Sequence, residues 1–143
     1  MSLTHQFAVI NKESKEKYIQ DSMPMVSIPD DLIQYMSDSL LWIYSRWNGG
    51  DLKSGISYYG FSYIEDEELK KLKDIIGGWK KLFELSPKQF VLTGNYVKDE
   101  VMKEEYYEKI YMSKVEIIVV LEDWENLCKN ALENNGKLLH NGI

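Results

Sequence analysis

Clusters of acidic side chains are the residues in this sequence whose type and spacing could support a chemical reaction or bind a metal ion. They occur together at 65–68, at 99–100 with 104–105, and at 122–125. Paired carboxylates can serve as acid and base in glycoside hydrolysis, or can bind a divalent cation, when they converge from different elements. The sequence has no D-x-D-x-D-G loop of the kind that binds calcium. The acidic groups are therefore interpreted as solvated helix starts and loops, with recognition of a partner as the functional alternative.

The recognition alternative centres on one connection and the strand that follows it. Carboxylates steer the approach of a basic protein, and neighbouring aromatic side chains supply contact area. The same tyrosines would equally suit the faces of a small sheet and core. We therefore predict an exposed partner-binding site that consists of Asp99, Glu100, Glu104, Glu105, Tyr106 and Tyr107.

His140 and Asn95 are the candidates for an alternative ligand pocket between a sheet and its helices. A catalytic histidine needs an orienting carboxylate and a nucleophile, so a structural hydrogen bond is the preferred role for His140. Cys128 lies on the apolar side of a predicted helix, where a free thiol is normally inert. One Cys and two His exclude a Cys/His zinc site, and no glycine motif indicates a nucleotide. We expect no metal and no cofactor.

Charge and hydropathy limit the kinds of partner. The chain of 143 residues holds 17 Lys and Arg against 23 Asp and Glu, for a net charge of −6. Such a surface repels phosphate backbones and anionic lipid, so nucleic acid and membrane are not expected partners. The longest apolar run, 117–121, is far shorter than a membrane span, and the start lacks a signal-peptide pattern. We expect a cytoplasmic protein with one domain over 1–143.

Apolar residues spaced by three and four predict three amphipathic helices, over 29–48, 66–85 and 114–134. Proline followed by two aspartates suits the start of the first helix, and a Gly-Gly pair ends it. Trp47, Trp79 and Trp124 lie on the apolar stripes of these helices. We therefore expect all three indoles to be largely buried.

Alternating and β-branched residues predict strands over 6–10, 55–64, 89–97, 106–111 and 137–140. The third and fourth of these would form an antiparallel hairpin with a charged tip, and the lone Gly94 indicates a bulge or a close backbone contact. The prediction is an α+β fold, in which one mainly antiparallel sheet of four or five strands packs with three helices.

Three segments carry a resemblance to known proteins: WKKLFELSP at 79–87, FVLTGNY at 90–96 and GKLLHNGI at 136–143. In these segments the chain resembles small bacterial proteins that include immunity proteins of polymorphic toxin systems. The resemblance implies a small cytosolic protein that works by binding, and it assigns no functional residue by position.

Two functional hypotheses follow from the residues and the resemblance together. The first is a non-enzymatic acidic module that binds a basic protein, as an immunity protein does when it neutralises a toxin. The alternative is a small-ligand binding protein or an enzyme that uses a pocket between sheet and helices.

Overall fold

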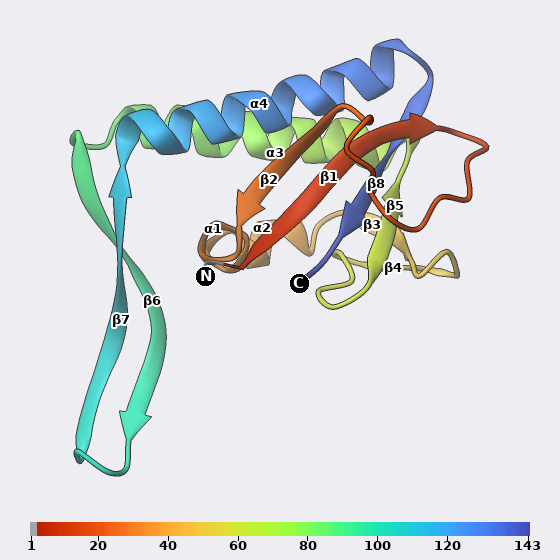
Figure 1. The fold of residues 1–143 in the computed structure, drawn as a ribbon. Coiled ribbons are helices and arrows are strands. Elements are labelled where there is room, and N and C mark those ends of the chain that lie inside the picture. Colours follow the sequence, from red (N-terminus) through yellow and green to blue (C-terminus); the bar gives the residue numbers. More distant parts are fainter. Residues whose placement is uncertain (1–2) are drawn as a thin grey trace.

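A six-stranded antiparallel sheet and two long helices make up the body of the protein in this computed structural model, which describes residues 3–143 (Figure 1). The strand order is β2-β1-β8-β5-β3-β4, and every neighbouring pair is antiparallel. The sheet strands are β1 (Thr4–Asn11), β2 (Met25–Pro29), β3 (Tyr44–Trp47), β4 (Leu52–Ser54), β5 (Phe61–Ile64) and β8 (Gly136–Asn141). The predicted α+β class with a mainly antiparallel sheet is confirmed.

The remaining elements are four helices and a separate hairpin, among the residues that are described. The helices are α1 (Asp30–Tyr35), α2 (Ser37–Leu40), α3 (Asp66–Glu84) and α4 (Lys114–Glu133). The hairpin consists of β6 (Gln89–Asp99) and β7 (Glu104–Ser113), which pair only with each other. The prediction of three helices and a single sheet of four or five strands is thus too simple.

The C-terminal strand β8 lies near the middle of the sheet, between β1 and β5. Its side chains alternate between two apolar clusters, because successive residues of a strand point to opposite faces. Leu138 packs in the main core against α3 and α4, while Leu139 packs with Ile10 and Tyr63 on the other face. The sheet is therefore covered on both sides of β8, which explains why β8 reads as an apolar run.

Both long helices match their predictions at 66–85 and 114–134. Asp66, Glu67 and Glu68 lie in the first turn of α3, and Lys81 lies in its last turn, so each charge favours the nearby end of the helix dipole. The two helices pack side by side across one face of the sheet (Figure 1). They enclose the main core with the sheet residues Phe7, Ile64 and Leu138.

The predicted helix over 29–48 is wrong beyond Leu40. Helices α1 and α2 are separated at Met36, and residues 44–47 form strand β3, which pairs with both β4 and β5. Met36, Leu40 and Ile43 are buried at the predicted spacing, but the backbone turns away from the helix. Aromatic residues such as Tyr44 and Trp47 suit a strand equally well, and the free edge of β5 supplies the hydrogen-bonding partner.

The predicted strand over 55–64 is likewise shorter, because only Phe61–Ile64 pairs in the sheet. Gly55 has a positive φ of 80°, which begins a loop rather than a strand. The carbonyl of Gly55 accepts hydrogen bonds from the Ser45 hydroxyl and from the Trp47 indole N–H. This loop carries Tyr58, whose role is described below.

Only one of the three tryptophans is buried as predicted. Trp124 is fully buried, and its ring lies 4.7 Å from that of Phe7, centroid to centroid. Trp47 and Trp79 are half-buried, so the expectation was wrong for both. Trp47 lies in β3 near the edge of the sheet, and Trp79 lines a surface groove, where its indole N–H donates to Ser39 Oγ at 2.9 Å.

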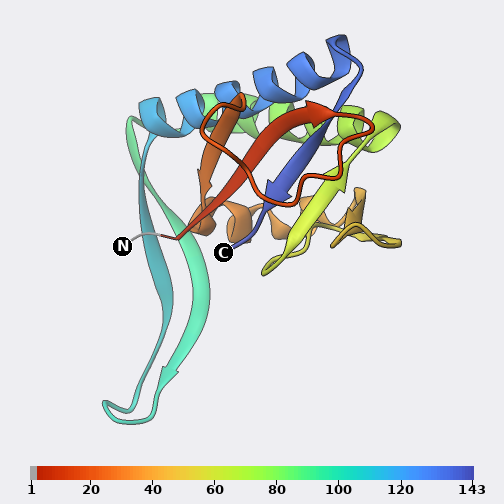
Figure 2. The same ribbon diagram turned by 45° about the vertical axis from the view of Figure 1, so that its right-hand side comes forward.

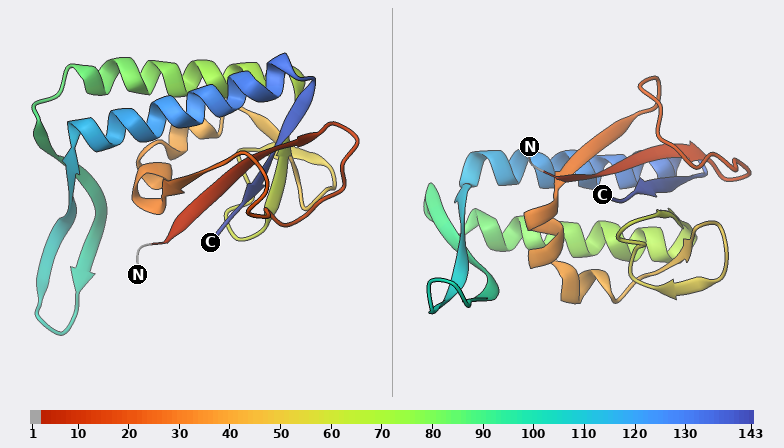
Figure 3. Two further views of the ribbon diagram at one scale, coloured as in Figure 1. Left: turned by 45° about the horizontal axis from the view of Figure 1, so that its top comes forward. Right: turned by 60° about the horizontal axis from the view of Figure 1, so that its bottom comes forward.

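The β6–β7 hairpin, which we call the arm, extends well beyond the body from the end at which α3 stops and α4 begins (Figure 2). The left view in Figure 3 also shows the hairpin extending away from the body. Near the body, Leu92 is buried and Phe90 stacks on Phe83 with ring centroids 5.6 Å apart. In residues 96–107 no side chain is buried. The predicted hairpin is confirmed, and it is longer than the sequence indicated.

Replacing Trp124 with alanine should lower the free energy of unfolding by about 3–5 kcal/mol, because a large, fully buried ring leaves a cavity. Replacing the half-buried Trp47 with alanine should lower the free energy of unfolding by a smaller amount. Urea denaturation of the two variants and the unmodified protein measures both values. A Trp124→Ala midpoint equal to that of the unmodified protein would contradict this description of the core.

Candidate functional site

The arm places five of the six predicted partner-binding residues on two opposite faces, and the sixth, Glu100, lies in the turn at its tip. Cross-strand partners share a face, and Tyr106 pairs with Val97 while Tyr107 pairs with Tyr96. Following this register, one face consists of Val97, Asp99, Glu104, Tyr106 and Glu108, and we call it the acidic face. The opposite face consists of Tyr96, Lys98, Glu105, Tyr107 and Lys109. The opposite face mixes both signs of charge, whereas the acidic face has no cation.

The tip of the arm, residues 99–104, has its own local structure. The Asp99 carboxylate accepts hydrogen bonds from the backbone N–H groups of Val101 and Met102, at 2.9 and 3.1 Å, so it holds the turn. Glu100 and Glu104 are exposed, and Val101 and Met102 are exposed beside them. The predicted acidic connection is thus at the surface, and it carries two apolar side chains that the sequence interpretation overlooked.

A second candidate site is a buried polar network that centres on Asp30. His5 and His140 are fully buried on the paired strands β1 and β8. His5 Nε2 lies 3.0 Å from Asp30 Oδ1, and His5 Nδ1 lies 3.0 Å from His140 Nε2. Asp30 also accepts hydrogen bonds from the Tyr58 hydroxyl and from Gln34 Nε2. Helix α1, strand β1 and the loop that carries Tyr58 therefore meet at one carboxylate, and β8 is joined to them through the contact of His140 with His5.

The chemistry of these groups fixes the direction of each hydrogen bond. A carboxylate can only accept, so His5 donates through Nε2 and its Nδ1 must accept when the ring is neutral. His140 then donates through Nε2, and its Nδ1 accepts from the Ser62 hydroxyl at 3.4 Å. Every polar atom of both rings is satisfied with the two histidines neutral.

Burial, partly opposed by Asp30, lowers the pKa of His5, and burial lowers the pKa of His140 to about 3. For Asp30, burial raises the pKa, but the hydrogen bonds from Tyr58, His5 and Gln34 lower it more. The network thus consists of one carboxylate and two neutral imidazoles. His140 has an indirect carboxylate partner, yet His5, His140 and Ser62 are all buried, so the geometry supports a structural role.

Acid should destabilise the protein through this network. The pKa of each histidine is lower in the folded state than its ordinary value of 6.5, so the unfolded chain binds more protons below that pH. The stabilisation is complete above pH 6.5 and is lost as the pH falls toward the folded-state pKa values. At pH ~5, His140 alone should account for a loss on the order of 2 kcal/mol.

Urea denaturation at pH ~7.5 and ~5 tests this expectation, with His140→Gln as the comparison. The variant should be less stable at neutral pH but should lose less stability on acidification than the unmodified protein. Equal losses for both proteins would show that His140 is not held neutral by the fold.

The network ends at a pocket beside the base of the arm. Asn95 Nδ2 donates to Gln34 Oε1 at 3.0 Å, which joins β6 to α1. The pocket has a volume of about 270 Å³, and we call it the polar pocket. Its lining residues are Ile33, Gln34, Ser37, Leu40, Leu41, Gly55, Ile56, Tyr58 and Asn95.

The structure does not bring the predicted pocket residues Asn95 and His140 together. Asn95 lines the polar pocket, while His140 lies behind it and connects to it through His5 and Asp30, which is bound by the lining residues Gln34 and Tyr58. Sequence reasoning missed His5, Asp30 and Tyr58 because they are far apart in the chain. The predicted strands gave no signal for this pair, because His140 falls on the predicted strand 137–140 but His5 lies just before the predicted strand 6–10.

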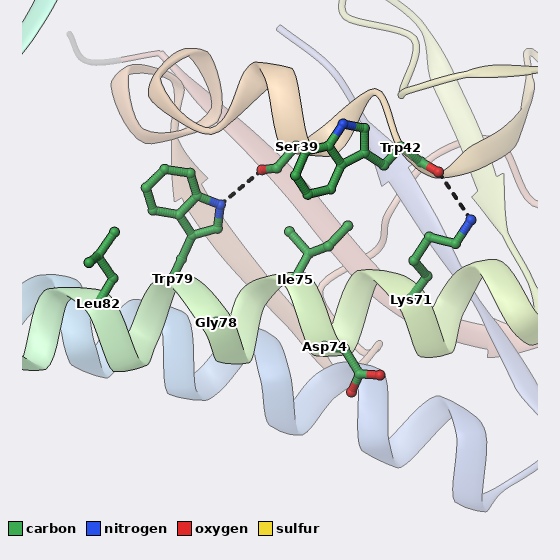
Figure 4. A pocket seen from close by; sticks show the side chains of 8 residues that line it. All are labelled: Ser39, Trp42, Lys71, Asp74, Ile75, Gly78, Trp79 and Leu82. Atoms are coloured by element: carbon green, nitrogen blue, oxygen red, sulfur yellow. Dashed lines mark hydrogen bonds between the residues drawn. The ribbon is translucent and has the colours of Figure 1, made fainter.

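An apolar groove with a volume of about 470 Å³ lies between α2 and α3 (Figure 4). Trp42, Ile75, Trp79 and Leu82 line it, and no side chain stands above Gly78. Two of its polar side chains are held by the protein itself: Trp79 donates to Ser39, and Lys71 Nζ donates to the Trp42 carbonyl. The groove mainly offers apolar contact area.

No family, curated protein or solved structure matches this chain. Within residues 3–143, no group of three or more His, Cys, Asp and Glu side chains is arranged to hold a metal ion. None of the described helices is long and apolar enough to cross a membrane. Burial raises the pKa of Cys128, so this thiol stays protonated.

Proposed function

We propose that this chain is a non-enzymatic protein-binding module that contacts a basic protein partner with the arm. The observation that carries the proposal is the length of hairpin that leaves the body: no side chain in residues 96–107 is buried. A two-stranded hairpin is marginal in water by itself, and its outer edges are unpaired. A partner would cover side chains and edges that the body leaves exposed.

The chemistry of the acidic face supports a basic partner. Asp99, Glu104 and Glu108 lie along one face with Tyr106 among them, and the whole chain has a net charge of −6. Carboxylates on an exposed element accelerate association with a positive surface, and a tyrosine supplies contact area after docking. Val101 and Met102, the two apolar residues at the tip of the arm, would add buried area beside these acids.

The resemblance noted at 79–87, 90–96 and 136–143 supports a more specific class, an immunity protein that neutralises a toxin. Neutralisation by occupancy requires no catalytic group, and it requires a surface that fits the toxin. The buried histidine pair, which no solvent reaches, suits a protein without an active site. We propose this class for the partner-binding activity of the arm.

Reversal of charge on the acidic tip should slow association without changing stability. Glu100→Lys with Glu104→Lys removes exposed carboxylates, so the association rate should fall about tenfold at low salt and depend less on ionic strength. Glu67→Lys with Glu133→Lys is the matched control, because both residues are exposed on helices of the body. Binding kinetics in a salt series measure the effect.

A tyrosine pair distinguishes the two faces of the arm. Tyr106 lies on the acidic face and Tyr107 lies on the opposite face, and both are about half exposed. Tyr106→Ala should weaken binding by about 2 kcal/mol through faster dissociation, while Tyr107→Ala should have a small effect. The reverse order of the two variants would mean that the partner docks on the other face.

The toxin hypothesis is tested with the protein captured from the cells in which this chain naturally occurs. The captured protein should arrest growth when it is expressed alone, and co-expression of the unmodified chain should restore growth. The Glu100→Lys, Glu104→Lys variant should restore growth less well than the Glu67→Lys, Glu133→Lys control. If both variants relieved growth arrest equally, the arm would not be part of the binding site. A captured partner that does not arrest growth would contradict the toxin hypothesis.

A further inference from the structure

We infer that the polar pocket at the base of the arm receives one arginine side chain of the basic partner. The inference rests on the proposed function for the source of that side chain, and on the pocket itself for its chemistry. The pocket lies where the acidic face of the arm meets α1 and α2. A protein docked on that face would therefore pass over it.

The hydrogen-bonding positions that remain open in the pocket are mainly acceptors. Both N–H groups of the Gln34 amide are used, toward Asp30 and Tyr58, whereas its Oε1 accepts only from Asn95. Asn95 Oδ1 and the Ser37 hydroxyl have no hydrogen-bond partner within residues 3–143. A ligand with several donors satisfies these atoms, and the guanidinium group has five N–H donors and no acceptor.

Charge favours the same ligand. A second depression shares Gln34, Ser37 and Asn95 with the pocket and is lined by the carboxylates of Asp31, Asp38 and Glu108. Neither hollow has a Lys or Arg in its lining. An anion is therefore repelled, and a cation seated at the shared amides would lie near uncompensated negative charge.

The apolar part of the pocket suits the aliphatic stem of an arginine. Ile33, Leu41 and Ile56 form this wall, and a stem of three methylene groups can lie along it while the head reaches the acceptors. Lysine is less suitable, because its compact ammonium group has three donors and cannot span acceptors on separate elements.

The pocket is preorganised by contacts already described. Asp30 holds Gln34 and Tyr58 from behind, so these groups do not need to be ordered by the ligand. The register shift between Thr93 and Tyr96 adds a residue to β6 and directs Asn95 toward α1. A rigid pocket loses less entropy on binding than a mobile one.

Titration of the whole protein with N-acetyl-arginine amide tests the inference without the partner. The probe should produce saturable shifts of the side-chain NH₂ resonances of Asn95 and Gln34 in ¹⁵N NMR spectra at millimolar concentration. The citrulline analogue has the same shape without the charge, and it should bind about tenfold more weakly, as should the lysine analogue.

Two variants assign the binding to this pocket. Asn95→Leu removes the open amide and Asp38→Asn removes a carboxylate, and each should weaken arginine binding severalfold. Glu133→Gln, on the exposed end of α4, is the control and should leave the affinity unchanged. Because Asp38 and Asn95 are both exposed, neither variant should prevent folding.

The possible results separate this inference from the proposed function. Absence of saturable shifts, equal affinity for arginine and citrulline, or no effect of Asn95→Leu and Asp38→Asn would overturn the arginine pocket. Specific arginine binding would support the pocket even if the charge-reversed arm still bound the partner normally. In that case the proposed role of the arm in partner binding would be wrong, while the arginine pocket would stand.

Discussion

The buried carboxylate of Asp30 is the interaction on which the arrangement of this protein depends. A charge with little access to water must be compensated, and three neutral donors from His5, Tyr58 and Gln34 surround it. These donors belong to strand β1, the loop before β5 and helix α1. The position of each element is therefore constrained by the need to satisfy one ionised group.

The same carboxylate links the two ends of the chain and the arm. Through His5 it determines which nitrogen of His140 carries the proton, and His140 lies in the C-terminal strand. Through Gln34 it reaches Asn95 at the base of β6. A polar network with every member satisfied specifies one geometry more sharply than apolar packing does, because displaced members leave buried atoms unpaired. The body can thus hold the base of a projecting hairpin in a fixed orientation.

The distribution of chemistry between interior and surface supports the proposed binding function. Two imidazoles and a carboxylate are used inside the protein as structural hydrogen-bonding partners. Carboxylates, tyrosines and amides on the arm and at its base remain accessible. These groups recognise a cation well but have no activated nucleophile among them.

The sequence by itself determined the elements whose signal is local. Helices α3 and α4 have apolar stripes that continue over 19 and 20 residues, and the hairpin has alternating strands around a charged tip. The segment at 29–48 had a helical spacing too, but strand pairing beyond Leu40 outweighed it, since the edge of β5 offered hydrogen bonds that spacing cannot reveal. Only the tertiary structure decided that His5 meets Asp30 and His140. It also decided how the register divides Tyr106 from Tyr107 and where Asn95 points, because all of these depend on contacts between residues distant in the chain.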